Sequence, residues 1–236
     1  MNKINYQLAL DKIIEENQKQ QKVPSLLMHS CCAPCSSYCL TYLAQYFRIT
    51  IFYYNPNISP ETEYKKRVKE QIRLIQSLDV KYPISFVEGT YEPEKFYEMA
   101  KGLEEVKEGG IRCFACYEMR QREAAYYAKE HGFDYFTTTL SVSPHKNAQK
   151  LNEIGLWLQE EVGVAYLVSD FKKKGGYLQS IELSKKYDLY RQDYCGCEFS
   201  KRQRERERIA KEKDSQKEQK CIANINDCPK EQECIA

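Results

Sequence analysis

The sequence predicts a single doubly wound, Rossmann-like α/β domain with a parallel sheet and flanking helices. Short apolar runs alternate with amphipathic stretches along most of the chain, which is the order expected when each strand is followed by a crossover helix. The 236 residues suffice for one sizeable core without requiring a second domain. Cysteine and polar residues follow several of the apolar runs, at the edge where parallel sheets place their ligands.

Five apolar runs are predicted strands, because each is short and several are rich in β-branched or aromatic residues. They are residues 26–28, 49–53, 84–87, 133–137 and 164–168. The amphipathic stretches between them are predicted helices. They are residues 36–46, 60–78, 113–131 and 147–161.

Both ends of the chain differ from this alternating pattern. A predicted helix at residues 3–21 precedes the first strand, and we expect the segment 1–24 to pack on the core. The catalytic domain is predicted to span residues 25–200. Residues 201–236 begin with a dense run of Lys, Arg and Glu and continue as a polar segment, which predicts a charged tail that is disordered or partly helical. This tail holds three cysteines with spacings too wide for a standard metal knuckle, and no role is assigned to them: Cys221, Cys228 and Cys234.

The overall charge is almost balanced, with 36 Lys and Arg against 34 Asp and Glu. The chain is therefore no general polycation, and any contact with RNA must be local. No apolar stretch approaches the length needed to cross a bilayer, so we expect a cytoplasmic protein without a membrane partner. Thiols stay reduced in that compartment, so 11 cysteines, an odd number, predict metal ligation or redox chemistry rather than a disulfide framework.

Seven of the cysteines fall into three short groups beside turn residues: Cys31, Cys32 and Cys35, then Cys113 and Cys116, then Cys195 and Cys197. Two groups together supply four thiolates, the usual complement of a [4Fe-4S] cluster. A structural zinc site also uses four ligands. Adjacent cysteines make a poor zinc knuckle, because neighbouring side chains on an extended segment point to opposite faces. The spacing favours iron and sulfide, with zinc as the alternative.

The first two groups lie where predicted helices begin. Pro34 suits the first turn of a helix, and the free backbone N–H groups there favour thiolate over thiol at Cys31 and Cys32. Cys113 and Cys116 are three residues apart, which puts both sulfurs on one side of a first helical turn. The same C-x-x-C spacing is also typical of a thioredoxin-like redox pair.

The third group has a different geometry. A disulfide between Cys195 and Cys197 would close a small, strained ring, and strain makes such a bond easy to reduce. Gly196 permits the backbone angles that the ring needs. This pair is therefore suited to electron exchange.

Basic residues near the predicted site are candidates for substrate contacts. Lys172, Lys173 and Lys174 follow the fifth predicted strand and could meet a nucleic-acid backbone at the mouth of the site. Arg191 is a further candidate phosphate ligand. Four residues are candidate proton donors by loop position alone: His29, Tyr117, Asp170 and Asp193.

Eight segments carry a family resemblance, in chain order HSCCAPC at 29–35, YNPNI at 54–58, EY at 63–64, RCFACY at 112–117, FTTTL at 136–140, SPHK at 143–146, DFKK at 170–173 and YRQDYCGC at 190–197. Together they resemble the QueH-type epoxyqueuosine reductases, formerly a domain of unknown function. The resemblance extends over residues 26–200 and leaves the charged tail outside it.

The resemblance implies a tRNA-modifying oxidoreductase that performs the last step of queuosine synthesis. It would convert the epoxide on the modified wobble base of tRNA into a cyclopentene without cobalamin, using electrons from a donor protein or a small reductant. Carried over residue by residue, Cys195 and Cys197 would be a redox-active pair. A [4Fe-4S] cluster would be held by Cys31, Cys32, Cys113 and Cys116.

Removing an epoxide oxygen as water takes two electrons and two protons, whereas one [4Fe-4S] cluster usually passes one electron at a time. Two hypotheses account for the second electron. Cys195 and Cys197 either store electrons as a dithiol, or they join Cys35 in holding one additional iron that polarises the epoxide oxygen.

Two other functions stay open at this point. An iron-sulfur-dependent sulfur-transfer enzyme acting on tRNA would generally need a phosphate-gripping Ser-Gly-Gly-type loop after the first strand, where this chain has SCCAPC at 30–35. A zinc-stabilised RNA-binding module would be colourless and free of acid-labile sulfide.

Overall fold

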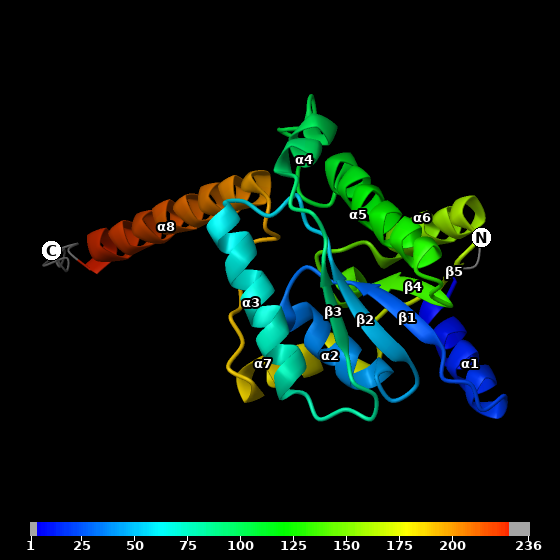
Figure 1. Cartoon of the computed structure of the whole chain (residues 1–236). Helices are drawn as coiled ribbons and strands as arrows, with labels where there is room; N and C mark the ends of the chain where they lie inside the picture. The colour runs from blue at the N-terminus through cyan, green and yellow to red at the C-terminus, as the bar shows by residue number, and fades with distance from the viewer. Residues whose placement is uncertain (1–3, 227–236) are drawn as a thin grey trace, which may run out of the picture.

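The computed structural model describes residues 4–226 and builds them around one five-stranded parallel sheet (Figure 1). The strands are β1 (Ser25–His29), β2 (Arg48–Tyr53), β3 (Ser85–Glu88), β4 (Tyr135–Thr138) and β5 (Ala165–Tyr166). Their order across the sheet is β3-β2-β1-β4-β5, and every neighbouring pair is parallel. The chain therefore reverses its winding between β1 and β4, and the predicted fold class is confirmed.

The sheet is buried on both faces, which explains why its strands appear as continuous apolar runs. In β1, Leu26 and Met28 join one core cluster, while Leu27 between them joins the other. All three side chains are fully buried. Alternate residues thus serve opposite layers, as the pleat of a strand requires.

Helices cover each face of the sheet. One layer holds α2 (Ala33–Leu43), α3 (Glu61–Ser77) and α7 (Gly176–Lys186), and the opposite layer holds α5 (Ile111–Glu130) and α6 (Ala148–Val162). Four of these five helices match the predicted ones, with somewhat different ends. α2 begins three residues earlier than the apolar pattern suggests, because Pro34 and Cys35 already belong to its first turn.

The N-terminal helix α1 (Tyr6–Lys19) begins at a side-chain cap, where Asn5 accepts a hydrogen bond of 3.2 Å from the backbone N–H of Leu8. Leu10 and Ile14 are buried in the core cluster that also contains Leu26. The apolar stripe of this helix therefore packs on the domain.

Helix α7 has no predicted counterpart, and its composition explains why. The residues that it buries are Gly176, Ser180 and Ser184, so it lacks the apolar stripe from which helices are recognised. Gly176 is needed for close packing, since a Cβ there would lie 2.0 Å from the carbonyl oxygen of Phe171 and 2.4 Å from the ring of Tyr38. Helix α4 (Pro93–Ala100) was also not predicted, because its eight residues bury only Phe96 and Ala100.

The charged run is a long helix, α8 (Glu198–Asn226), which projects away from the sheet (Figure 1). It begins inside the segment expected to belong to the catalytic domain, and its first turns contact the loop before α5. The backbone N–H of Glu108 donates a hydrogen bond of 2.9 Å to the side chain of Gln203. Residues 227–236, with Cys228 and Cys234, lie outside the described part of the chain.

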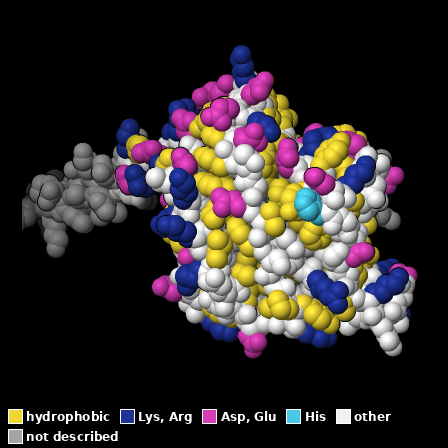
Figure 2. Space-filling model, in the orientation of Figure 1, with side chains coloured by type: hydrophobic (Ala, Val, Ile, Leu, Met, Phe, Trp, Pro, Cys, Tyr) yellow, Lys and Arg dark blue, Asp and Glu magenta, His cyan; other side chains and the backbone are white. Residues whose placement is uncertain are grey.

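Charged side chains of both signs are interspersed over the face shown in Figure 2, in keeping with the balanced composition. Among the helices formed by residues 4–226, none combines the length and the apolar character that a membrane-spanning helix needs. Two short 3-10 helices, η1 (Thr139–Val142) and η2 (Lys173–Gly175), follow β4 and β5 on the side of the sheet where the cysteines lie.

Candidate metal and active site

Several loops meet at the carboxyl ends of β1 and β4, where the strand order reverses. The loop after β1 leads into α2, and η1 follows β4 directly. A pocket of about 170 Å³ opens between these loops and the segment before α8. Its lining includes Cys31, Cys35, Glu108, Lys146, Cys195 and Arg204. The pocket therefore lies at the topological switch point, where doubly wound sheets bind their ligands.

Cys31, Cys32 and Cys35 form a compact group at the start of α2. Their sulfur atoms all lie within 4.8 Å of one another, and those of Cys31 and Cys32 are 3.9 Å apart. Cys32 is the N-cap of α2, with an extended backbone. The adjacent thiols of Cys31 and Cys32 come together where the chain turns into this helix. Hydrogen bonds from the thiols of Cys31 and Cys35 lower the pKa of Cys32 well below its usual value. The same hydrogen bonds raise the pKa of Cys31 and Cys35. The positions of the three sulfur atoms could hold one metal ion.

Cys113 and Cys116 lie near the start of α5, as the sequence predicted, with Cys113 in the first turn and Cys116 in the second. The backbone N–H of Gly109 donates to the sulfur of Cys113 at 3.3 Å. Burial raises the pKa of Cys116 to about 11. Both cysteines line a small cavity of about 10 Å³ together with Cys195 and Cys197.

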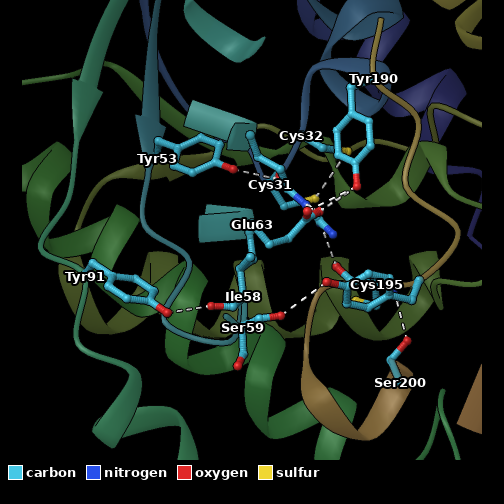
Figure 3. A network of polar contacts seen from close by, with 12 residues as sticks. Cys31, Cys32, Tyr53, Ile58, Ser59, Glu63, Tyr91, Tyr190, Cys195 and Ser200 are labelled. Carbon is cyan, nitrogen blue, oxygen red and sulfur yellow. Dashed lines mark hydrogen bonds and ion pairs between the residues drawn. The ribbon is translucent and has the colours of Figure 1, made fainter. Parts of the chain in front are cut away.

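The segment from Cys195 to Cys197 is held in an unusual backbone conformation. Gly196 has a φ of 128°, and its carbonyl oxygen accepts a hydrogen bond of 2.9 Å from Ser59. Arg67 donates to the carbonyl oxygen of Cys195 at 3.1 Å, and the N–H of Cys195 donates to the hydroxyl of Ser200 at 3.0 Å. Figure 3 shows Cys195 between Ser59 and Ser200. Both thiols of this segment are free.

The structure brings the three cysteine groups into one region. Cys195 lines both the open pocket beside Cys31 and the small cavity beside Cys113. Cys31, Cys32 and Cys113 belong to one buried cluster of side chains. The sulfurs of Cys31, Cys32 and Cys35 are close enough to share one ion, whereas a cubane would spread its ligands more widely because each sulfur bonds a different iron.

Lys146 is a site residue to which the sequence gave no role. Its ammonium is buried and lies 3.0 Å from the sulfur of Cys195 and 3.0 Å from a carboxylate oxygen of Glu108. Burial opposes its charge, but the neighbouring Cys195, Tyr117 and Glu108 outweigh that cost and raise the pKa of Lys146 well above its usual value. Its signals in the sequence were its place in the loop after the fourth strand and in the SPHK segment at 143–146.

Comparison with known proteins decides the family. The model of the family described as epoxyqueuosine reductase QueH matches residues 26–203. The chain belongs to the QueH family. An epoxyqueuosine reductase QueH from Staphylococcus epidermidis is 48% identical, over 84% of this chain and 85% of its own. Relatives with the same description from Streptococcus pyogenes and Thermotoga maritima are 40% and 36% identical, over 91% and 75% of this chain and 85% and 90% of their own.

The family resemblance drawn from the motifs is thereby confirmed for this QueH chain. Among solved structures, NMN synthetase from Francisella tularensis aligns with a TM-score of 0.41 and 13% sequence identity, over 78% of this chain and 70% of its own. That similarity is too low to bear on function.

The surroundings of two buried arginines show whether the QueH site fits a thiolate-bound metal centre. Arg67 and Arg120 are each 1% exposed, and within residues 4–226 one terminal nitrogen of each guanidinium, Nη2, has no hydrogen-bond partner. Burial opposes the charge on Arg120, while Cys116, Cys195 and Cys31 favour it and raise its pKa. Arg67 is paired with Glu63 at 2.7 Å, whereas no carboxylate within residues 4–226 pairs with Arg120. The donor set and the Arg120 cation therefore fit an anionic metal–thiolate group, since a buried charge needs a partner.

The predicted substrate contacts divide into two kinds. The ammonium of Lys172 donates to the carbonyl oxygens of Ser141 and Lys146 at 3.2 and 3.3 Å, and Lys174 pairs with Asp11 of α1 at 2.7 Å. Both contacts are internal to the chain. Lys173 is exposed and has no ion pair in the described part of the chain. Arg191 is exposed and lines the open pocket.

The candidate proton donors lie in very different surroundings. His29 is fully buried between Thr138 and the carbonyl of Tyr54, and burial lowers its pKa to about 4, so it is neutral near pH 7. Tyr117 lines the four-cysteine cavity. Asp193 is exposed at the edge of the open pocket, and Asp170 pairs with Lys172 at 3.3 Å.

Proposed function

We propose that this chain reduces epoxyqueuosine in tRNA to queuosine, without cobalamin, in the cytoplasm. Membership of the QueH family supports the reaction, and one structural observation carries the proposal for this chain. Cys195 lines the pocket that opens to solvent and also the cavity that holds Cys113, Cys116 and Cys197. A thiol in that position links a substrate pocket to the other sulfur ligands.

A [4Fe-4S] cluster is the cofactor that these cysteines fit best. Cys31, Cys32, Cys113 and Cys116 would hold it, and it would supply electrons one at a time. Cys32 is the N-cap of α2, where free backbone N–H groups and the neighbouring thiols favour the thiolate form that binds metal. Arg67 and Arg120 would offset the negative charge of the bound group.

Cys195 and Cys197 would store both electrons of each turnover as a redox-active pair. Their dithiol holds two electrons and two protons, so oxidation to the disulfide converts the epoxide into an alkene and one water with atoms and electrons in balance. A donor protein or a small reductant would then restore the dithiol. The ammonium of Lys146 lies 3.0 Å from the sulfur of Cys195. This contact suits the dithiol version as well as one in which Cys35, Cys195 and Cys197 hold an additional iron, because an N–H donor can bond a thiolate that also binds a metal.

The open pocket would receive the modified part of the wobble nucleoside. Its volume of about 170 Å³ is below the roughly 300–1,000 Å³ of pockets that enclose whole drug-sized ligands, so the rest of the RNA would lie on the surface. Lys173 and Arg191 are placed to meet phosphates there, with Lys172 and Lys174 in supporting positions. Lys146 is the buried cation nearest to the reacting sulfur and would hold a proton for the departing oxygen.

The decisive test combines metal analysis with turnover. Protein purified without oxygen should contain about four irons and four sulfides per chain, show the brown absorption of a cluster, and convert epoxyqueuosine in tRNA. Cys195→Ser should keep its iron and lose turnover. A colourless protein that holds zinc without sulfide would instead support an RNA-binding module, and a tRNA product that gains sulfur would support a sulfur-transfer enzyme. A fifth iron bound through Cys195 would favour the additional metal ion over the dithiol.

A further inference from the structure

Asn57, in the turn after β2, has a buried carboxamide without a hydrogen-bond partner anywhere in residues 4–226. The residue is 1% exposed, and neither its Nδ2 nor its Oδ1 atom reaches a partner. A carboxamide offers two donor hydrogens and an acceptor oxygen, so burying it unpaired costs free energy. A favourable interaction of the Asn57 amide in the working protein must offset that cost in free energy.

The turn that carries Asn57 is held firmly. Tyr91 donates from its hydroxyl to the carbonyl oxygen of Ile58 at 2.8 Å (Figure 3). Ser59 donates from its backbone N–H to the carbonyl oxygen of Gly196 at 2.9 Å. The two residues that follow Asn57 thus have partners. The Asn57 side chain therefore lacks a hydrogen-bond partner although its backbone is held in place.

Backbone conformation does not require asparagine at this position. Among the described residues, the non-glycine positions with positive φ are Gln21, Lys174 and Asp188. Asn57 is absent from that group, so other side chains can adopt its backbone angles. The reason for an amide must lie in what the side chain faces.

Asn57 faces the small cavity lined by the four thiols of Cys113, Cys116, Cys195 and Cys197. Two more unpaired polar groups of the described chain line the same cavity, the Tyr117 hydroxyl and the Nη2 nitrogen of Arg120. A space of about 10 Å³ holds at most one water molecule, and a buried water typically makes about three hydrogen bonds, fewer than these four polar atoms need. These groups therefore need partners among the sulfurs and whatever the sulfurs bind.

We propose that Asn57 donates a hydrogen bond from Nδ2 to a sulfur of the metal–thiolate centre and thereby raises the reduction potential of that centre. This inference rests on the metal centre of the proposed function and assigns it a residue outside its ligands. Reduction adds negative charge that spreads onto the sulfurs, and an N–H dipole aimed at sulfur stabilises the reduced form more than the oxidised form. Loss of one such bond should shift the reduction equilibrium about tenfold, which is about 59 mV for a one-electron couple.

The test compares Asn57→Leu and Asn57→Asp with Asn152→Leu in the full chain. Leucine has a similar size without polar atoms, and aspartate keeps the shape while replacing the N–H donor by a negative charge. Asn152 is the matched control, because it is also buried but its Nδ2 donates to Ala148 and Ser169 at 2.7 and 2.8 Å. Three quantities are measured: iron and sulfide per chain, the midpoint potential of the iron-loaded protein, and the urea midpoint of the metal-free protein.

We expect Asn57→Leu to bind iron, to show a potential lowered by the equivalent of about tenfold, and to be at least as stable as the wild type when metal-free. Asn57→Asp should lower the potential further. Asn152→Leu should show the reverse pattern, with an unchanged potential and a less stable metal-free chain. Loss of iron from both Asn57 variants, with iron retained in Asn152→Leu, would also support a contact with the centre.

Equal potentials in the wild type, Asn57→Leu and Asn57→Asp at full iron content would overturn this role for Asn57 and leave the proposed enzyme intact. A metal-free Asn57→Leu protein as unstable as Asn152→Leu would overturn it too, since the amide would then be needed for folding alone. A wild-type chain that binds neither iron nor sulfide would overturn both this inference and the metal centre on which it rests.

Discussion

The ammonium of Lys146 lies 3.0 Å from the sulfur of Cys195, although 49 positions separate the two residues. The same ammonium lies 3.0 Å from Glu108, whose other carboxylate oxygen accepts a hydrogen bond of 3.1 Å from Ser200. Lys146 is thus a buried cation shared by a carboxylate and a sulfur. The sulfur of Cys195 is therefore within hydrogen-bond distance of a buried positive charge.

Replacing Lys146 by Met should make Cys195 less nucleophilic. Without the ammonium, the thiolate loses a charge-assisted hydrogen bond of about 1.5–3 kcal/mol, so alkylation of Cys195 near neutral pH should slow about tenfold or more. The measurement is the rate of iodoacetamide labelling of Cys195 in the metal-free protein, read by mass spectrometry. Lys150→Met is the control, because Lys150 is half-buried at the surface and pairs with Glu153 instead of with a sulfur. Equal labelling rates in the wild type and Lys146→Met would contradict the ion pair.

Gly196→Ala should lower both stability and turnover. The φ of 128° is strained for any residue with a Cβ, and that Cβ would lie 3.0 Å from Ile58 and 3.1 Å from the guanidinium of Arg67. We expect a loss of about 1–3 kcal/mol in the free energy of unfolding, together with displacement of Arg67 from Cys195. Urea unfolding and turnover are the two measurements.

Gly132→Ala is the control that separates the effect of backbone strain from the effect of the contacts with Ile58 and Arg67. Gly132 also has a positive φ, of 68°, but a Cβ there would meet nothing within 4 Å. It should therefore lose stability with turnover retained. If both alanine variants kept full turnover, the conformation of the Cys195–Cys197 segment would not matter for the reaction.

The strands and four of the principal helices could be predicted because their signals are local. Leu26 to Met28 form an apolar run whose side chains are buried on both faces of the sheet. In the amphipathic stretches, the spacing of apolar residues shows which side of each helix is buried. Helix α7 escaped prediction because Gly176, Ser180 and Ser184 pack through small size rather than through apolar character. A pattern of hydrophobicity carries no information about such a close approach.

The candidate site was predictable where chemistry repeats at short spacing and not where it depends on distant partners. Each cysteine group was visible as a motif beside a turn. Lys146 and Asn57 also lie in recognised segments, SPHK and YNPNI, but their roles were not predicted. Lys146 acquires its role from Cys195 and Glu108, and Asn57 from a cavity that only the folded chain creates. The sequence predicted a partly helical charged tail but not the contact of Gln203 with Glu108, which joins positions 95 residues apart.

Single cysteine replacements should divide the thiols by their effect on iron content. Cys31→Ala and Cys113→Ala should lose most of the bound iron, because each removes one ligand of the proposed cluster. Cys39→Ala is the matched control: Cys39 is fully buried in the same helix as Cys35, and its thiol donates to the backbone of Cys35 at 3.4 Å. It should keep its iron with a modest loss of stability. Retention of full iron in Cys113→Ala would contradict the proposed ligand set.

The three lysines before Gly175 should contribute unequally to tRNA binding, although the sequence alone treats them alike. Lys173 is exposed and free of ion pairs within residues 4–226, whereas Lys174 is paired with Asp11 at 2.7 Å. Each phosphate contact removed should flatten the slope of log K against log salt concentration by about 0.7–0.9, so Lys173→Ala should change the slope and Lys174→Ala should not. Arg191→Ala should act like Lys173→Ala, because Arg191 is exposed beside the pocket. Filter binding of tRNA over a range of salt concentrations measures the slopes, and identical slopes for all three variants would place the RNA on another surface.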